Sequence, residues 1–437
     1  MAEILLGEAN RLSAAHAAQA IRGRRLSSLA LVEACLARIA VREPSVGAWS
    51  HLDRDGALRQ AREADARQRA GAALGPLHGL PVGVKDVFDT ADMPSEYGSG
   101  SLRGRRPERD ADAVAALRAA GAIVIGKTVT SEFGMYAPTS CRNPHDPARS
   151  AGVSSAGSAA AVADAMVPLA LGTQHTASTL LPASFCGAFG FKPSPGFTSM
   201  SGSNILVPRL ANIGFLARSV DDLALFASVF CAGLEPPLVP RRPKRLGLVR
   251  GPARPGVAAD AWEALARLIR RIAAPVEALA LPSPFARAEQ ITHGLLAADL
   301  ADRFGAMPAA VRAGYCAPLR DLIAAGARLS AADRLAFDRV ADDVAAAADA
   351  LFASCDALIT LSALGEATDA SEPGSGAMCM PWSLAGLPAV SLPLLRGASG
   401  LPIGVQLIGP RGADARLLPI AAWLSRVVVL ENISEPA

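Results

Sequence analysis

The sequence predicts an α/β fold, in which helices are layered on a β-sheet. Segments with helical periodicity alternate with short apolar segments, an order typical of this class. The clearest example is a helical pattern at residues 110–120 followed by the buried strand AIVIGKT at residues 122–128. The chain has 437 residues, of which 51% are hydrophobic and 19% charged, so it can bury a sizeable core and is not disordered as a whole.

The first part of the chain, residues 1–70, is predicted to be helical. Residues 27–39 carry apolar side chains at helical spacing after a serine start signal, and residues 55–70 are amphipathic and rich in Ala and Arg. The pattern then changes. Apolar side chains alternate over residues 80–84, which predicts a strand, and Lys85 follows directly.

A central region, residues 71–235, is predicted to contain much of the sheet. After the strand at 80–84, its expected elements are a helix at 110–120, strands at 122–128 and 167–172, an Ala-rich helix at 158–166, a Gly-rich strand at 185–191 and a helix at 219–233. A further strand is expected at 245–249. Residues 258–357 are Ala-rich and nearly all helical, so we expect a cap there. The C-terminal region, 358–437, is expected to return strands to the sheet, at 356–361, 389–395 and 403–409.

Composition excludes several classes of function. The net charge of +3 is too small to indicate a nucleic-acid partner, and the basic run at 241–245 is interpreted as a solvated linker. No apolar run reaches about 18 residues, so no membrane span is expected. The six His form no metal-binding pattern, and neither a metal nor another cofactor is expected. The seven Cys are widely spaced and the N-terminus is unlike a secretory signal, which favours a cytoplasmic location.

Residues 150–182, SAGVSSAGSAAAVADAMVPLALGTQHTASTLLP, are rich in hydroxyls and almost free of charge. A serine hydroxyl is a good nucleophile only when a base removes its proton. A role for Ser178 as a helix cap fits the pattern as well. His175 is interpreted as incidental rather than as a base. Lys85, which precedes Asp86, fits both a buried base and a surface ion pair.

Five ordered segments resemble the amidase signature family. They are GPLHGLPVGVKD (75–86), GAIVIGKT (121–128), NPHDPARSAGVSSAGSAAAVADAMVPLALGTQ (143–174), PASFCGAFGFKP (182–193) and GLPIGVQLIG (400–409). Their order and spacing hold across almost the entire chain, so the resemblance implies a single domain over residues 1–437. It also implies a single large mixed β-sheet sandwiched between helical layers, and a Ser–Ser–Lys catalytic triad.

In this pattern Lys85 is the base, Ser154 the bridging serine and Ser178 the acylated nucleophile. Family members have a cis peptide before the bridging serine. The chemistry is consistent from the residues upward, because a lysine acts as a base only when burial lowers its pKa from about 10.4. Lys85 ends an apolar strand, which would desolvate it. Ser154 would pass a proton between Lys85 and Ser178.

The resemblance also implies the surroundings of the triad. Backbone N–H groups of the nucleophile loop would form the oxyanion hole, namely those of His175, Thr176, Ala177 and Ser178. Met135 and Tyr136 lie in a loop that reaches the substrate pocket in the family, and we expect them to line it. Leu181 stands where an Arg usually follows the nucleophile by three residues. We expect Leu181 to contact a neutral or apolar acyl group.

The chain departs from the family pattern close to the nucleophile. Val153 and Ala156 stand in place of motif glycines, and Thr176-Ala177 replaces a Gly-Gly or Ala-Gly pair. If the geometry were unchanged, each replacement would carry strain of about 1–3 kcal/mol. Either the loop geometry differs or the site is altered. Together with Leu181, Gln174 argues against the amidotransferase subunit that acts on charged tRNA, and favours amidases of the biuret, urea-derivative and general amide type.

These features predict an amide hydrolase that acts on a small-molecule substrate. Two alternatives remain open at this point: a catalytically silent subunit or scaffold, and an acyltransferase or esterase that uses the same acyl-enzyme. The cap is expected to cover the pocket with Phe285, Leu296 and Phe304, which would suit an apolar substrate tail. By analogy with the family, the chain is expected to form a homodimer or to bind a small accessory subunit.

Overall fold

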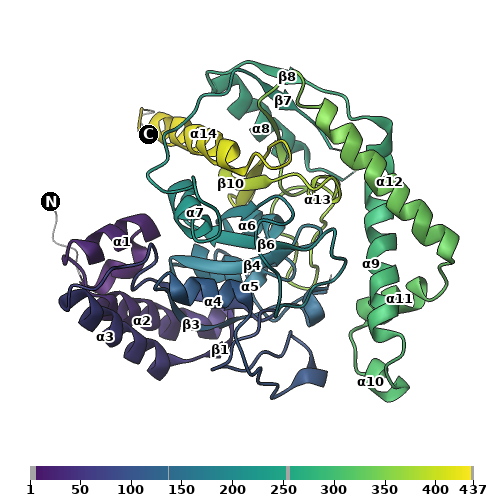
Figure 1. Cartoon of the computed structure of the whole chain (residues 1–437). Coiled ribbons are helices and arrows are strands. Elements are labelled where there is room, and N and C mark those ends of the chain that lie inside the picture. Colours follow the sequence, from purple (N-terminus) through teal and green to yellow (C-terminus); the bar gives the residue numbers. More distant parts are fainter. Residues whose placement is uncertain (1–5, 136, 252–255, 435–437) are drawn as a thin grey trace.

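The computed structural model describes residues 6–135, 137–251 and 256–434 (Figure 1). Within these residues one mixed sheet has the strand order β1-β3-β2-β4-β6-β5-β10-β11-β9-β7-β8. Its strands are β1 (Trp49–Leu52), β2 (Pro81–Lys85), β3 (Ile123–Thr128), β4 (Leu169–Gln174), β5 (Phe189–Lys192), β6 (Asn212–Ala217), β7 (Leu246–Leu248), β8 (Val276–Ala278), β9 (Ala357–Leu361), β10 (Ala389–Arg396) and β11 (Pro402–Ile408). The predicted α/β fold, with one large mixed sheet between helical layers, is confirmed.

Helices cover both faces of this sheet. They are α1 (Ala14–Arg22), α2 (Ser28–Val46), α3 (Arg54–Arg69), α4 (Asp112–Ala119), α5 (Ala156–Ala163), α6 (Leu180–Cys186), α7 (Val220–Ala227), α8 (Ala259–Arg271), α9 (Ala288–Phe304), α10 (Ala309–Ala313), α11 (Ala317–Gly326), α12 (Ala331–Ala350), α13 (Met380–Leu384) and α14 (Asp414–Ser434). Short 3₁₀ helices are η1 (Leu6–Arg11), η2 (Gly100–Leu102), η3 (Glu132–Gly134) and η4 (Ser283–Arg287). No described helix is both long and apolar enough to cross a membrane.

Alternation along the central strands divides the core between the two faces. Val82 and Val84 of β2 pack in a cluster that includes residues of α1, α4 and α7. On β3, Ile123 and Ile125 pack in another cluster with residues of α3 and α5. This is the period-two pattern of a strand that is buried on both sides. All five residues of β2 are buried, including Lys85 at its end.

The parallel pairing of β2 and β4 positions the candidate site. Val82 lies opposite Leu169 and Val84 opposite Leu171, so both strands run toward the same edge of the sheet. Lys85 ends β2 at that edge. Gln174 ends β4 there, and the nucleophile loop follows it.

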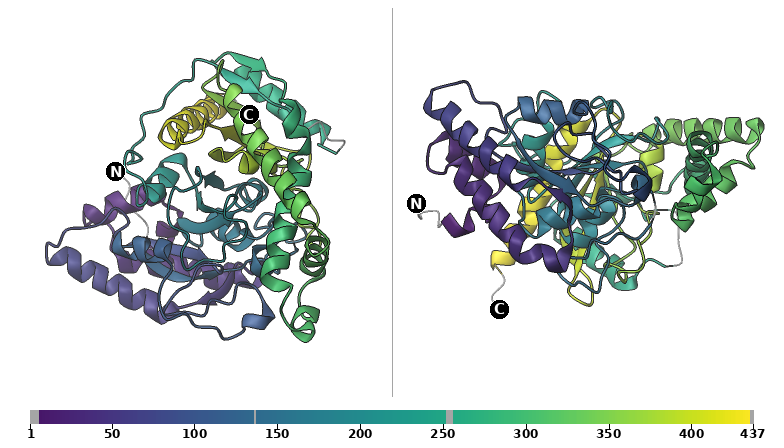
Figure 2. Two further views of the ribbon diagram at one scale, coloured as in Figure 1. Left: turned by 45° about the vertical axis from the view of Figure 1, so that its right-hand side comes forward. Right: turned by 90° about the horizontal axis from the view of Figure 1, so that it is seen from below.

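A helical arm extends from one side of the sheet. It contains η4 and helices α9 to α12, and Figure 1 shows it as the green helices at the right. Seen from below, in the right panel of Figure 2, α9 to α12 project beyond the layers that sandwich the sheet. We use the word cap for η4 and α9–α12. The sequence boundary at residue 258 was too early, because α8 packs on β9 and β10 and β8 adds an edge strand beside β7.

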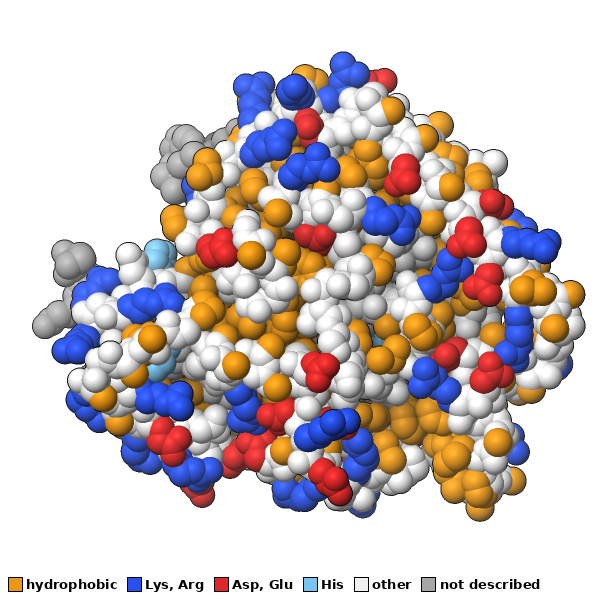
Figure 3. Space-filling view, in the orientation of Figure 1, with side chains coloured by type: hydrophobic (Ala, Val, Ile, Leu, Met, Phe, Trp, Pro, Cys, Tyr) orange, Lys and Arg blue, Asp and Glu red, His pale blue; other side chains and the backbone are white. Residues whose placement is uncertain are grey.

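Charged side chains of both signs are spread over the face of the molecule that Figure 3 shows. Basic and acidic groups alternate there rather than gather into one field of a single sign, in keeping with the net charge of +3. Hydrophobic side chains gather at the lower end of the cap, around α10. Met307, just before α10, is 40% exposed.

Two further sequence predictions differ from the structure. The strand expected at 185–191 begins only at Phe189, since residues 180–186 form helix α6. Tertiary contacts at the start of α6 override the Gly-rich local pattern. Strand β1 lies inside the region expected to be helical. It has only four residues and pairs antiparallel with β3. A segment that short gives no periodicity for the sequence to reveal.

Candidate active site

Lys85 ends β2 in the interior of the protein. Its side chain is fully buried, and Nζ donates hydrogen bonds of 2.7 Å to Oγ of Ser154 and to Oγ1 of Thr173. Among the described residues no carboxylate pairs with it. Asp86 pairs with Lys127 instead, with 2.9 Å between Oδ1 and Nζ, so the alternative of a surface Lys85–Asp86 pair is wrong. Burial lowers the pKa of Lys85 well below its ordinary value of 10.5.

The two serines of the sequence prediction lie around the end of β4. Ser155 and Thr179, the residues that follow Ser154 and Ser178, both donate hydrogen bonds to the carbonyl oxygen of Thr173, at 3.2 and 3.0 Å. Both predicted serines are themselves buried. The hydroxyl of Ser154 accepts the bond from Lys85. In the described part of the chain, the hydroxyl of Ser178 makes no hydrogen bond.

Gln174 organises the turn that carries Ser178. Its Oε1 accepts hydrogen bonds of 2.9 and 3.0 Å from the backbone N–H groups of Thr179 and Leu180, at the start of α6. Its Nε2 donates to Oγ of Ser383, which in turn donates to the carbonyl oxygen of Thr176. The side chain therefore fixes the loop on both sides of Ser178. It supplies the helix with the cap that its own N-cap residue does not provide.

The loop at residues 175–178 presents backbone donors that the protein leaves unused. No hydrogen bond among the described residues involves the N–H groups of His175, Thr176, Ala177 or Ser178. All four residues are buried. Buried backbone N–H groups are almost always paired, so a run of unpaired ones indicates a place for an external acceptor.

His175 cannot serve as the base in this arrangement. Its Nε2 accepts a hydrogen bond of 3.2 Å from the backbone N–H of Leu206. Burial is the main reason that the pKa of His175 is lowered to about 3. The ring is therefore neutral at ordinary pH, and its accepting nitrogen is already occupied. This agrees with its interpretation from sequence as incidental.

The strain expected from the replaced glycines is absent. Among the described residues, left-handed φ values outside glycine occur only at Arg24, Tyr97, Phe133, Ala165 and Val207. Val153, Ala156, Thr176 and Ala177 thus adopt backbone conformations that any residue tolerates. The one glycine of the motif with a left-handed backbone conformation is Gly152, at φ +99°. It is retained in the sequence.

The peptide bond before Ser154 also differs from the expectation. Pro236–Pro237 is the one cis bond among the described residues, so the bond from Val153 to Ser154 is trans. Lys85 nevertheless reaches Ser154.

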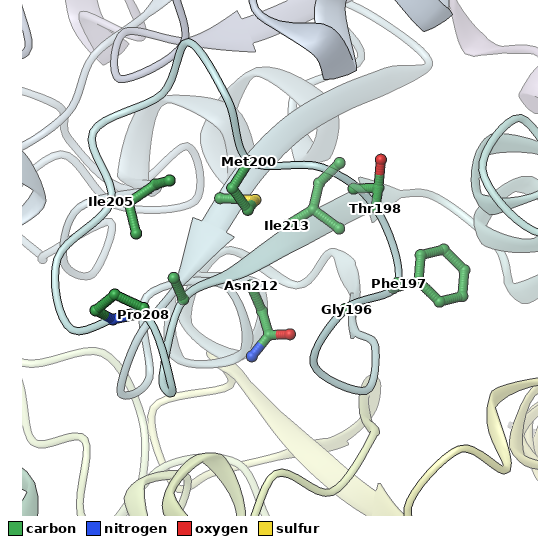
Figure 4. Close-up of a pocket in the computed structure, with 9 residues that line it drawn as sticks. Gly196, Phe197, Thr198, Met200, Ile205, Pro208, Asn212 and Ile213 are labelled. Carbon is green, nitrogen blue, oxygen red and sulfur yellow. The ribbon is translucent and has the colours of Figure 1, made fainter.

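The three residues predicted to bind substrate have different surroundings. Leu181 is fully buried in an apolar cluster that also contains Val153 and Ala177. Met135 is buried in a second cluster, beside the cap, with Leu206. Tyr136 lies outside the described residues. A cavity of about 240 Å³ is lined by other residues. Figure 4 shows its lining, including Met200, Ile205, Ile213 and the amide of Asn212, and none of the predicted substrate residues is among them.

Sequence reasoning missed Thr173 and Ser383, and it named Gln174 only as a mark of the amidase type and not for its structural role. Thr173 contacts Lys85 directly, yet its only signal is a lone hydroxyl in an apolar strand. The structural roles of Gln174 and Ser383 come from contacts that span up to 209 positions of the chain, which no local pattern reveals. In the described part of the chain, no group of three or more His, Cys, Asp or Glu is placed to hold a metal ion.

Comparison with known proteins gives one consistent result. A family model described as Amidase matches residues 30–247 and 255–418. The A subunit of the glutamyl-tRNA(Gln) amidotransferase of Symbiobacterium thermophilum is 35% identical over 98% of each chain. That of an Anaeromyxobacter species is 34% identical over 95% of this chain and 96% of its own.

Comparison with solved structures gives the same family. A crystal structure of an amidase superposes with a TM-score of 0.87, at 28% identity, over 95% of this chain and 99% of the other. A native peptide amidase from Stenotrophomonas maltophilia gives 0.83 at 27% identity, over 95% and 97% of the two chains.

Proposed function

The chain belongs to the amidase family, and we propose that it hydrolyses the C–N bond of a small, neutral or apolar carboxamide through an acyl-enzyme at Ser178. The observation that carries this proposal is the contact of 2.7 Å between Nζ of Lys85 and Oγ of Ser154. It joins a buried lysine, which has no counter-charge among the described residues, to the serine that the family pattern assigns to proton relay. That contact links residues 69 positions apart, so local structure does not account for it.

Lys85 is suited to act as the base. Burial disfavours its ammonium form, so the neutral amine, which can accept a proton, becomes available at a pH well below 10.5. Its two partners, Ser154 and Thr173, are neutral hydroxyls that do not restore the charged form as a carboxylate would. The arrangement keeps the amine oriented without keeping it protonated.

The reaction then proceeds in balanced steps. Oγ of Ser178 bonds to the amide carbon while its proton passes to Ser154, and the proton of Ser154 passes to Nζ of Lys85. The unpaired N–H groups of residues 175–178 stabilise the oxyanion. Lys85 returns its proton through Ser154 to the leaving nitrogen as the C–N bond breaks. A water molecule then attacks the ester by the same relay and releases the acid and Ser178.

The apolar surroundings support a neutral acyl group. Leu181, Val153 and Ala177 share a buried cluster with Phe285 and Leu296 of the cap. A carboxylate placed among these side chains would lose its hydration without gaining a partner, at a cost of several kcal/mol. Phe304 packs in the other cluster, with Met135, rather than in this one. We therefore assign the acyl side of the substrate to Phe285 and Leu296.

Hydrolysis of a panel of amides tests this proposal. The panel contains neutral aliphatic, aryl and biuret-like amides, each matched with a carboxylated analogue, and the enzymes are wild type and Ser178→Ala. We expect turnover of neutral members by wild type alone. Turnover that survives in Ser178→Ala would exclude the acyl-enzyme. A preference for the carboxylated analogues would exclude the substrate assignment.

A second candidate is an amide-hydrolysing component that works within an amidotransferase. The relatives that match over their whole length carry that description, which favours this candidate independently of the site. It predicts release of ammonia from glutamine, and activity that depends on a partner chain. The two candidates are separated by the glutaminase activity of the purified chain, measured alone and with a lysate of the organism that encodes it, which would supply the partner chain. Activity on glutamine that exceeds activity on every neutral amide would favour the amidotransferase component.

A further inference from the structure

The loop at residues 131–135 contacts the cap on one side and approaches Ser154 on the other. It contains η3 and joins β3 to the segment before the nucleophile motif. A Cβ atom on Gly134 would lie 3.9 Å from Oγ of Ser154 and 4.0 Å from a methyl group of Val87. Gly134 itself has no Cβ, so its backbone borders the space beside the Ser154 hydroxyl and forms one wall of it.

Phe133 holds this loop in an unusual conformation. Its φ of 50° and ψ of 22° are in the left-handed region, which bulky residues rarely occupy. Its backbone N–H donates to the carbonyl oxygen of Tyr97 at 2.8 Å, and its own carbonyl oxygen accepts from Nδ2 of Asn204 at 2.7 Å. Its ring packs on two aromatic rings of the cap, with centroids 4.8 Å from Phe304 and 5.8 Å from Tyr315.

Glu132 makes a second connection from the loop to the cap. Its Oε2 accepts a hydrogen bond of 2.7 Å from the backbone N–H of Cys316, and its Oε1 accepts one of 2.7 Å from the hydroxyl of Ser99. Cys316 is the N-cap residue of α11 and makes no capping bond with its own side chain. The carboxylate of Glu132 instead satisfies the backbone N–H of the N-cap residue itself and complements the positive end of the helix dipole.

We propose that Glu132 and Phe133 are positioning residues, through which α9 and α11 of the cap hold Gly134 against Ser154. This inference rests on the proposed function, since it assigns a role in the relay from Ser178 to Lys85. With the loop in place, the wall excludes water from Ser154 and keeps its hydroxyl directed at Lys85. With the loop released, water competes for Nζ, and the relay loses its alignment. The cap then controls the rate of catalysis and not only access to it.

A fluorophosphonate probe measures the relay without a known substrate. Oγ of Ser178 bonds to phosphorus, fluoride leaves, and the proton of Ser178 passes through Ser154 to Lys85, so the maximal labelling rate depends on the relay. Phe133→Ala removes the aromatic contact and Phe133→Leu retains apolar bulk. Cys316→Pro deletes the N–H that Glu132 binds, at a φ of −61° that proline accepts, and Cys316→Ser retains it. Val344→Ala, in α12, is the control for a loosened cap.

We expect Phe133→Ala and Cys316→Pro to lower the maximal labelling rate by about tenfold or more, with the half-saturating probe concentration little changed. Phe133→Leu and Cys316→Ser should recover most of the rate. Val344→Ala should be labelled at the wild-type rate, although its melting temperature falls by at least as much as those of Phe133→Ala and Cys316→Pro. Wild-type rates in Phe133→Ala and Cys316→Pro would overturn this inference alone. A wild type that the probe does not label would overturn the proposed function as well.

Discussion

At the scale of single residues, the proposed site depends on a lysine whose burial makes folding less favourable. Lys85 is buried with two hydroxyl partners and, among the described residues, no acid. Such a group is a poor choice for stability, which is typical of residues retained for chemistry. The family motifs assign Lys85, Ser154 and Ser178 to the site, and their catalytic roles remain a prediction. Thr173 could not be predicted, because its role depends on a contact with a residue 88 positions away.

The relay serine gives the first prediction. Ser154→Ala should lower kcat by about 10²–10⁴-fold on any amide that wild type hydrolyses, with KM little changed, because proton transfer is lost and binding is not. Ser28→Ala is the matched control, since Ser28 is also buried and its hydroxyl has no partner among the described residues. Steady-state kinetics measure both. A Ser154→Ala enzyme within a few-fold of wild type would contradict the relay.

The pH profile gives a second prediction. Neutral Lys85 is the active form, so kcat/KM should rise with pH through the lowered pKa of Lys85 and be high well below pH 10.5. Thr173 accepts a hydrogen bond from Nζ and so favours the ammonium form. Thr173→Val should therefore lower this pKa further and move the rising limb to lower pH. A limb that stays in place or moves to higher pH would show that another group controls the profile.

At the scale of elements, the sheet was more predictable than the helix that carries the nucleophile. Alternation over residues 80–84 and the apolar run before Thr128 both indicated strands, since their side chains face cores on both sides. The end of helix α6 was predicted as part of a strand, since the start of this helix depends on the side chain of Gln174. The trans bond before Ser154 could not be predicted either, because the motif gives no information on how the loop accommodates Val153.

The junction between the motif loop and α6 gives a third prediction. Gly152 has φ +99°, and a Cβ there would lie 2.8 Å from Cα of Pro182. Gly400 has φ +79°, but a Cβ there would meet no atom within 4 Å. Gly400→Ala therefore measures the cost of backbone strain without a steric clash. Gly400→Ala should cost about 1–2 kcal/mol of unfolding free energy, and Gly152→Ala clearly more, with loss of activity. Equal costs in urea denaturation would mean that the loop and α6 are not tightly joined.

At the scale of the whole molecule, the fold class could be predicted but the extent of the cap could not. Ala-rich composition made residues 258–357 look uniform, yet α8 and β8 belong to the sheet layers. The cap proper has two separate connections to the site. One is the loop at 131–135, and the other is Leu206, which packs beside the cap and whose N–H binds His175. The predicted homodimer or accessory subunit remains a prediction. Light scattering tests it against the monomer mass of 44.8 kDa.

Stability of the whole chain should depend on pH through a second buried lysine. Lys192 is fully buried at the end of β5, its Nζ donates to the carbonyl oxygen of Pro193, and burial lowers its pKa to about 7. Between this value and about 10.4 the unfolded chain binds the proton and the folded chain does not, so Lys192 makes folding more favourable as pH rises. The stability of wild type relative to Lys192→Met should then increase by about 1.4 kcal/mol per pH unit in that window.

The exposed Lys244 provides the control for this prediction. Lys244→Met should show a difference from wild type that changes little with pH. Chemical denaturation at pH 7, 8 and 9 supplies all three free energies of unfolding. A wild type that gains no stability over Lys192→Met across this range would place a proton on Lys192 in the folded protein.

The most direct test of the central claim is to map the residue that a fluorophosphonate modifies. Wild type and Lys85→Met are treated with the probe, weighed intact and digested, and the modified peptide is sequenced by mass spectrometry. The account predicts one adduct per wild-type chain, on Ser178, and a rate lower by at least about 10²-fold in Lys85→Met. An adduct on another residue, no adduct, or equal rates in the two proteins would contradict it.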